Sequence, residues 1–497
     1  MTPSLRRAAV GWVAWAAVGR ATQRLFRTAT RLVLARLLWP EAFGLFALAS
    51  VVVAGAQVLC QLQIPASVIQ RRAVTPRLLS TAHWSLAVLG GAGTLALATL
   101  AAPISGLLGH PAVAPLLQAS ALQLVLTGLS GAARAWLVRE LAFKQMVTLR
   151  LASDGASSAV AIGAALAGAG VWSLVIQELV ADLVDVVLLW RMVPWRPRLH
   201  WRLDEFRELL DFGLPLLGRS GLNYVADSGD RFLVGRVFGP EALGFYSLAL
   251  RLAEALTDAI SGVFERVGFP AFARSREDLE RTRRGFLEAT RVHALLVVPT
   301  VVATASLAQD LVPLLLGAVW SGAVPFTQVL AARALLGSML SVPRAALLGR
   351  GRQWLIAGVS LSGVGAFVLG WTLGLPWGPL GVAIGGTAAS ACLIPLSLWA
   401  LRSDLPFRLV RWGRALVPSL VGGAVMAMAM AATPRLLPAL SAADRPVRIA
   451  VLLFAGALGY VLLVAAWLRA DLREYARLLG RGSSAPEPTG PKSGPSA

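Results

Sequence analysis

Four arginines near the start of the chain have the spacing of a single helical face. Arg20, Arg24, Arg27 and Arg31 are separated by four, three and four positions, and no acidic residue lies among them. The segment around them is apolar, and a charged side chain at mid-bilayer costs about 2.5–3.5 kcal/mol. Such a face is tolerated only where it meets water or a partner. Because Arg donates paired hydrogen bonds to phosphate oxygens, the row predicts a phosphate or pyrophosphate site.

Other apolar segments carry polar side chains in similar helical rows. The further candidates for substrate binding are Arg219, Asn223, Arg231 and Arg251. A partly buried carboxylate in a membrane can exchange a proton or bind Na⁺, which would couple a gradient to transport. The candidates for that role are Asp154, Asp227, Asp230, Glu254 and Asp258. The alternative for each of these residues is an interhelical ion pair that holds the structure together.

The composition predicts an all-α integral membrane protein. Hydrophobic residues make up 56% of the 497 positions and charged residues only 14%, against about 25% in an average soluble protein. With about 20 residues per transmembrane helix, the length allows roughly 12–14 transmembrane helices. The apolar segments lie near 10–37, 42–65, 80–108, 112–137, 143–168, 171–192, 209–238, 242–271, 286–316, 323–348, 354–376, 378–401, 412–433 and 447–468.

The net charge of +20 does not indicate nucleic-acid binding, because the arginines stand at the ends of apolar segments without interleaved aromatics. Alternate junctions are basic, and Lys and Arg accumulate on the cytoplasmic side of a membrane. We therefore expect both termini in the cytoplasm. No small-residue cleavage site follows the first apolar stretch, so we expect no cleaved signal peptide. The loops are too short for a catalytic domain, and Cys60 and Cys392 give no metal site or disulfide framework. No enzyme activity, metal or cofactor is expected.

An internal repeat divides the chain into halves. Residues 31–49 and 231–249 align without a gap, and eight of 19 positions are identical, including Pro40-Glu41-Ala42 and Pro240-Glu241-Ala242. An offset of six helices gives both copies the same orientation, so the halves are related by an axis along the membrane normal. We expect a six-helix lobe at 1–200, a second at 201–405, two further transmembrane helices at 406–470, and a cytoplasmic, largely disordered tail at 471–497.

The repeated motif resembles the signature of bacterial Wzx-type polysaccharide flippases, in the exporter superfamily that includes multidrug (MATE-like) transporters. Further matching pieces are Ile69-Gln70-Arg71-Arg72, Arg139 to Lys144, and Gly170 to Leu174. The resemblance covers roughly residues 5–400 and is greatest to colanic-acid exporters. It implies alternating access around a cationic cavity in the bacterial inner membrane, with undecaprenyl-pyrophosphate-linked oligosaccharide as the cargo. Membrane lipids, H⁺ or Na⁺, and other polysaccharide-assembly proteins are the expected partners.

Three other functions stay open at this point. A peptidoglycan-precursor flippase shares the pyrophosphate chemistry and differs only in family motifs. A multidrug exporter of the same superfamily would favour an acidic cavity for its cationic substrates, which the arginine row opposes. A membrane polysaccharide polymerase or glycosyltransferase would need a larger loop or domain than this chain offers.

Overall fold

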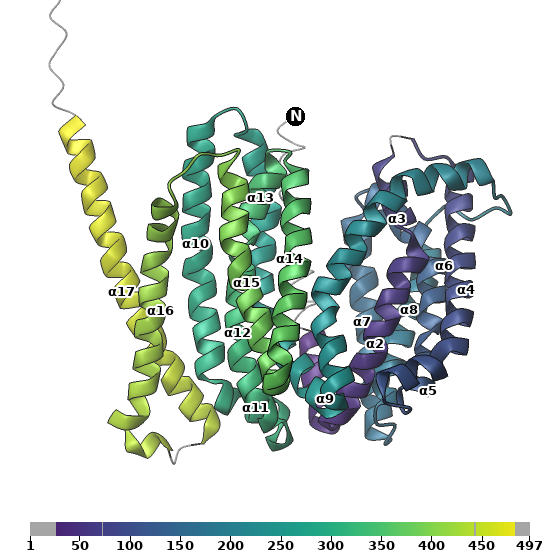
Figure 1. The fold of residues 1–497 in the computed structure, drawn as a ribbon, viewed down its shortest axis with the longest axis horizontal. Helices are drawn as coiled ribbons and strands as arrows, with labels where there is room; N and C mark the ends of the chain where they lie inside the picture. Colours follow the sequence, from purple (N-terminus) through teal and green to yellow (C-terminus); the bar gives the residue numbers. More distant parts are fainter. Residues whose placement is uncertain (1–25, 72, 442–443, 483–497) are drawn as a thin grey trace, which may run out of the picture.

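The structure is a computed structural model that describes residues 26–71, 73–441 and 444–482, and almost all of this part is helical. Figure 1 shows two groups of helices side by side. The first group contains α2 (Pro40–Gln61), α3 (Ile64–Gln70), α4 (Pro76–Leu108), α5 (Val113–Ser120), α6 (Leu122–Arg139), α7 (Phe143–Leu166) and α8 (Trp172–Met192). The second contains α10 (Leu279–Ser306), α11 (Ala308–Leu316), α12 (Val324–Ser338), α13 (Ser341–Gly349), α14 (Gln353–Gly374) and α15 (Gly378–Arg402), with α16 (Leu409–Leu436) and α17 (Arg445–Gly482) on its outer flank.

One long helix, α9 (Leu203–Arg274), connects the two groups. It is broken at Gly239, whose φ of 89° and ψ of 174° are non-helical, and Pro240 follows the break. A positive φ suits glycine, and proline cannot continue the hydrogen-bond ladder of the preceding helix. The two halves of α9 therefore correspond to the predicted separate segments at 209–238 and 242–271.

The all-α membrane fold is confirmed, and Figure 1 is consistent with two lobes. Eight stretches of the described chain are long and apolar enough to cross a membrane, and one of them contains both α14 and α15. At 24 and 21 residues, α7 and α8 also have the length to cross, but they carry several charges. The total of 12–14 transmembrane helices stays a prediction.

Proline and capping side chains at the N-termini explain where several helices begin. Pro40 is the first residue of α2, where its missing N–H costs no hydrogen bond. The Thr75 hydroxyl caps α4 by accepting from the Leu78 N–H at 3.1 Å, and Asp278 caps α10 by accepting from the Arg281 N–H at 2.9 Å. These caps begin α4 and α10 four and seven residues before the apolar runs from 80 and 286.

Two details differ from the sequence expectations. The predicted segments at 112–137 and 323–348 are each broken, into α5 with α6 and into α12 with α13. The last helix, α17, continues to Gly482, so the first part of the expected disordered tail is helical. The remainder of that tail, 483–497, lies outside the described residues.

The two copies of the repeat pack against each other between the groups. α2 runs along the first half of α9, where Tyr224 donates to the Val51 carbonyl at 2.7 Å, and its Pro40 end meets the break at Pro240. Leu48 and Leu248 are both buried in the main core. The contact between the repeat motifs lies at the end of the molecule where most junctions between helices carry few charges. Its position there follows from Arg36, whose Nε donates to the carbonyl of Leu315, in the last turn of α11, at 2.9 Å. The repeat thus forms a direct connection between the halves of the chain.

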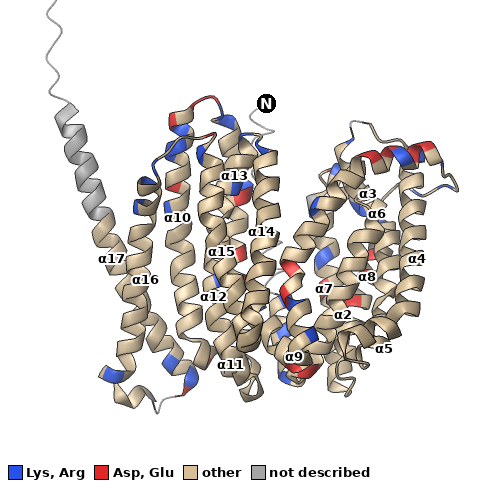
Figure 2. Cartoon of the chain, in the orientation of Figure 1, with Lys and Arg blue, Asp and Glu red and all other residues tan. Residues whose placement is uncertain are grey.

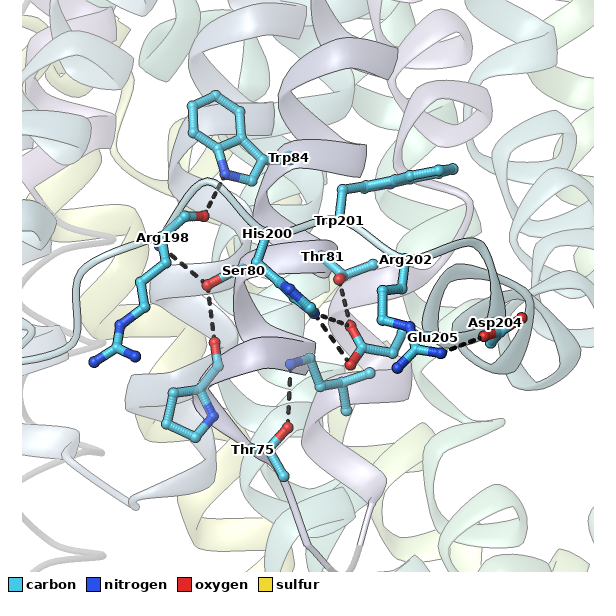
Figure 3. Close-up of polar contacts among 12 residues, drawn as sticks. Thr75, Ser80, Thr81, Trp84, Arg198, His200, Trp201, Arg202, Asp204 and Glu205 are labelled. Atoms are coloured by element: carbon cyan, nitrogen blue, oxygen red, sulfur yellow. Dashed lines mark hydrogen bonds and ion pairs between the residues drawn. The ribbon is translucent and has the colours of Figure 1, made fainter.

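The segment between α8 and α9 is held on the first group. Figure 3 shows Trp84 of α4 donating to the Arg198 carbonyl, at 2.8 Å, and Thr81 donating to the Glu205 carboxylate, at 2.5 Å. His200 Nε2 lies 3.3 Å from the same carboxylate. The start of α9, which the sequence analysis assigned to the second lobe, is therefore attached to the first.

Candidate functional site

Charged side chains inside the helical region concentrate on a few helices. Figure 2 shows long uncharged stretches in most helices, and charged residues part-way along α7, α8 and α9. A charge at this depth needs a partner or water. Among the described residues, some of these charged side chains form ion pairs with each other, and others line cavities.

The first paired cluster joins the arginine row to α7. The guanidinium of Arg27 contacts Asp154 Oδ1 through Nε at 2.8 Å and through Nη2 at 2.7 Å. Arg134 of α6 lies 2.5 Å from Asp185 of α8, and Ser153 donates to the same carboxylate. Both carboxylates are almost fully buried. Arg27 and Asp154, predicted as substrate and coupling-ion residues, therefore pair with each other.

A second paired cluster lies between α9 and α12. Asp230 is fully buried, and its Oδ2 lies 2.5 Å from Arg333 Nη1 and accepts from the Tyr246 hydroxyl at 2.7 Å. Arg333 also packs over the ring of Phe367, 5.5 Å from its centroid. The interhelical ion-pair alternative thus describes Asp230 better than exposure to a transported ion.

Three adjoining cavities, of about 340, 330 and 210 Å³, lie along the second half of α9, and Glu254 and Asp258 line all three. The smallest lies between the helix at 26–37 and α9, and it is lined by Arg31 and Arg251. The 330 Å³ cavity extends among α12, α13, α14 and α15 of the second group. The cavities therefore connect the arginine row with the interior of the second group.

Arg31 and Arg251 differ from Arg27 in their surroundings. Among the described residues, neither guanidinium has an ion-pair partner of the kind that Arg27 has in Asp154. Both line the same cavity, Arg31 from the helix at 26–37 and Arg251 from α9, together with Glu254 and Asp258. Two arginines that face an open volume can receive an anion without first losing a fixed hydrogen-bonded partner.

The remaining predicted residues fall in different places. Asn223 and Asp227 line the 330 Å³ cavity, and Arg231 lines the 340 Å³ cavity. Arg219 is exposed on α9 and lines none of these three cavities. Arg20 and Arg24 lie outside the described residues.

The family resemblance implies a cationic cavity with carboxylates as candidate ion sites, and the lining of these cavities carries both charges. The 340 Å³ cavity has three arginines and three carboxylates, namely Arg231, Arg251, Arg333, Asp227, Glu254 and Asp258. The helix at 26–37 supplies only arginine to this region, but the fold brings the acids of α9 to the same space. Charge on a single helix therefore did not determine the charge of the cavity.

Sequence reasoning also missed two cavity residues, Arg333 of α12 and Arg344 of α13. Both lie within one apolar predicted segment, at 323–348, which carries no other charged residue. An arginine at that depth is itself a signal of a buried partner or an aqueous cavity. Applied to this segment, that rule would have identified both arginines as candidate cavity residues.

Comparisons with known proteins agree with the fold and the repeated motif. A family model described as "Polysaccharide biosynthesis protein" matches residues 33–325. Lipopolysaccharide biosynthesis protein WzxC of Escherichia coli (strain K12) is 27% identical over 344 residues, which cover 68% of this chain and 69% of WzxC. Succinoglycan biosynthesis transport protein ExoT of Rhizobium meliloti (strain 1021) is 26% identical over 332 residues, or 67% of each chain.

Two solved structures share the fold. Lipid II flippase MurJ, in an inward closed conformation, gives a TM-score of 0.71 at 14% identity and covers 92% of this chain and 100% of MurJ. A multidrug resistance MATE family transporter of the MOP superfamily, in an inward-facing conformation, gives 0.61 at 16% identity and covers 78% and 98%. The apolar helices and these relatives make the chain a multi-pass inner-membrane transporter rather than an enzyme. Because the family model matches more than half of the 497 residues, the chain belongs to the polysaccharide biosynthesis protein family.

Proposed function

We propose that this protein flips an undecaprenyl-pyrophosphate-linked oligosaccharide across the bacterial inner membrane by alternating access. The observation that supports this most is the position of Arg31 and Arg251, which face one cavity from the helix at 26–37 and from α9. A guanidinium binds phosphate oxygens through paired hydrogen bonds, and the attraction is stronger in a low-dielectric cavity than in water. The pyrophosphate of the cargo is the group that this pair would bind.

The carboxylates in the cavity provide a step at which cargo loading could be coupled to an ion. Glu254 and Asp258 line the same cavity as Arg31 and Arg251, and in our proposal they are the counter-charges of these arginines in the unloaded protein. The cargo pyrophosphate competes with them for the arginines. Protonation of these carboxylates, or binding of Na⁺ to them, would weaken that competition and so favour loading. H⁺ and Na⁺ are therefore the candidate coupling ions, with Glu254 and Asp258 as their sites.

The direction of transport follows from the loop charges. Lys and Arg accumulate on the cytoplasmic side of a membrane, so the basic junctions support a cytoplasmic position for that end of the helices. The contact between the two repeat motifs, in which Gly44 meets Pro240 and Gly244 meets Pro40, lies at the opposite end, beside the last turn of α11. A cavity closed at that end would load from the cytoplasmic side and release its cargo after the contact opens.

Complementation tests the cavity assignment. A strain that lacks its own oligosaccharide flippase receives the wild-type chain, Arg31→Ala, Arg251→Ala, or the control Arg435→Ala, an exposed arginine at the far end of α16. Surface polysaccharide should fall at least tenfold for Arg31→Ala and Arg251→Ala and stay unchanged for Arg435→Ala, at equal protein in the membrane. Full rescue by the double variant Arg31→Ala/Arg251→Ala would remove these residues from the site.

A second strain separates the two pyrophosphate cargoes. Cells depleted of their lipid II flippase should not be rescued by the wild-type chain, although the fold resembles MurJ. Rescue there, without rescue in the first strain, would assign the protein to peptidoglycan precursor instead.

A further inference from the structure

A second basic cavity, separate from the transport cavities, lies at the basic end of the second group. Its volume is about 330 Å³, and its walls are Arg283, Arg402, Arg408 and Arg411, with Pro406 and Phe407. It lies where the start of α10, the end of α15 and the start of α16 meet. No carboxylate is among these lining residues, in contrast to the mixed lining along α9.

The acidic residues nearby already have other partners. Asp404, in the junction between α15 and α16, accepts hydrogen bonds from Arg350 and from Arg352. Glu280 lies 2.7 Å from Arg283 and is half exposed. Among the described residues, Arg402, Arg408 and Arg411 have no such acidic partner. The positive charge of this cavity is therefore largely uncompensated.

The backbone adds to the attraction for an anion. α16 is 28 residues long and begins at Leu409, and within the described part of the chain no side chain caps its N-terminus. The free N–H groups and the positive end of the helix dipole favour a phosphate at such a position. Arg408 precedes the first turn and Arg411 lies within it, so both guanidiniums and the helix end serve the same cavity. One lining residue is anchored in the core, because Phe407 is buried and packs on Phe286 with ring centroids 5.1 Å apart.

The surroundings favour a lipid over a soluble anion. Trp399, Leu409 and Val410 flank the arginines, and they are 69%, 45% and 65% exposed. Exposed apolar side chains at the end of a transmembrane helix face acyl chains, and tryptophan is enriched at the membrane interface. A headgroup phosphate could thus occupy the arginine cavity while its acyl chains lie along this apolar flank.

We propose that this cavity, at the junction of α10, α15 and α16, is a binding site for the headgroup of an anionic phospholipid. The lipid would hold α16 and α17 against the second group from the basic side of the membrane. This site is independent of the transported cargo, because it shares no lining residue with the cavities along α9.

Native mass spectrometry of the full chain in detergent, with added phosphatidylglycerol or phosphatidylcholine, tests the proposal. The variant is Arg402→Gln/Arg408→Gln/Arg411→Gln, and the matched control is Arg435→Gln at the other end of α16. The wild-type chain and the control should retain phosphatidylglycerol at least tenfold more strongly than phosphatidylcholine, and the triple variant should lose that preference. The single variant Arg408→Gln, at an exposed position, should give a partial loss and serves if the triple variant does not fold.

Two further arms identify the source of the anion. Inorganic phosphate at millimolar concentration should displace little phosphatidylglycerol, and undecaprenyl pyrophosphate should not displace it selectively. Retention of the lipid preference in a folded triple variant would overturn the site. Displacement of the lipid by phosphate alone would make the cavity a small-anion site. Selective displacement by undecaprenyl pyrophosphate would make it part of the cargo path. Either result would overturn the phospholipid assignment.

Discussion

Gly44 of α2 lies directly against the backbone carbonyl of Pro240 in α9, with no space for a side chain between them. A Cβ built on Gly44 would lie 1.6 Å from the Pro240 oxygen. The relationship is reciprocal, since a Cβ on Gly244 would lie 2.0 Å from the oxygen of Pro40. The glycine and proline of each repeat copy thus contact the proline and glycine of the other, as expected for a pseudo-twofold axis between them.

Alanine at either glycine should prevent this close approach. Neither neighbour is a flexible side chain, so backbone must move to accept the methyl group, at a cost of about 1–3 kcal/mol or more. We expect Gly44→Ala and Gly244→Ala each to lower the thermal unfolding midpoint in detergent and to reduce complementation, and the double variant to abolish it.

Gly91→Ala is the matched control, because a Cβ at Gly91 in α4 has no heavy atom within 4 Å. Replacing a helical glycine there should be neutral or slightly stabilising. Equal behaviour of Gly44→Ala and Gly91→Ala would show that the contact between the two copies does not limit stability or transport.

Arg36 should reinforce the same contact from the end of the arginine-bearing helix. Its Nε and Nη2 donate to the carbonyls of Leu315 and Leu314, which end α11 in the second group. A hydrogen bond from a charged donor contributes about 1.5–3 kcal/mol. Arg36→Ala should therefore lower the unfolding midpoint more than Arg435→Ala, measured by differential scanning fluorimetry. Arg36→Lys should fall between them, because a lysine supplies charge without the paired donors. A midpoint for Arg36→Ala equal to that of the control would show that these bonds are dispensable.

Much of the helical layout could be predicted from the sequence. Apolar runs of sufficient length located most of the helices, although α10 begins seven residues before its run and α17 continues beyond its own. The Gly239-Pro240 pair explains the break in α9. The repeat predicted related halves, and the structure packs the two copies together. These features are local, or are visible as identity between two segments, so no knowledge of distant contacts was needed.

The pairing of the charges could not be predicted in the same way. Arg27 and Asp154 are 127 positions apart, and nothing in either segment indicates that α7 presents its carboxylate to the arginine row. Arg31, four positions after Arg27 on the same face, lines a cavity instead. Periodicity identifies a polar face, but the neighbouring helices decide which of its members are neutralised.

The buried pair of Asp230 and Arg333 gives a test that distinguishes structure from ion coupling. Removing one partner of a buried ion pair leaves an unpaired charge and costs about 3–5 kcal/mol, whereas apolar or neutral replacement of both is often tolerated. Asp230→Asn should therefore strongly destabilise the protein. Asp230→Asn/Arg333→Met should recover most of the lost stability, and Tyr246→Phe should cost only about 1 kcal/mol.

Transport provides the decisive readout for the pair. If Asp230 is structural, the double variant should restore both the unfolding midpoint and a measurable part of the complementation. A double variant that is stable but wholly inactive would instead assign the Asp230–Arg333 pair to the transport mechanism, since Arg333 also lines the cavities.

The junction between α15 and α16 should give the fold a defined response to acid. Burial of Asp404 opposes ionisation, but hydrogen bonds from Arg350 and Arg352 outweigh it and hold the pKa of this carboxyl below its ordinary value. A group whose pKa is lower in the folded state stabilises the fold fully above its unfolded pKa, which is about 3.9 for Asp. That contribution is lost as the pH falls through the folded pKa.

Asp404→Asn should therefore unfold at a lower temperature than wild type at pH 7 and at pH 5, by the same margin, and the margin should shrink toward pH 3. The measurement is thermal unfolding in detergent at the three pH values. Asp204→Asn is the control, because its side chain is 76% exposed beside Arg202, and exposed ion pairs contribute little. A margin for Asp404→Asn that persists undiminished at pH 3, or that Asp204→Asn reproduces, would mean that the two arginines do not stabilise the ionised carboxylate.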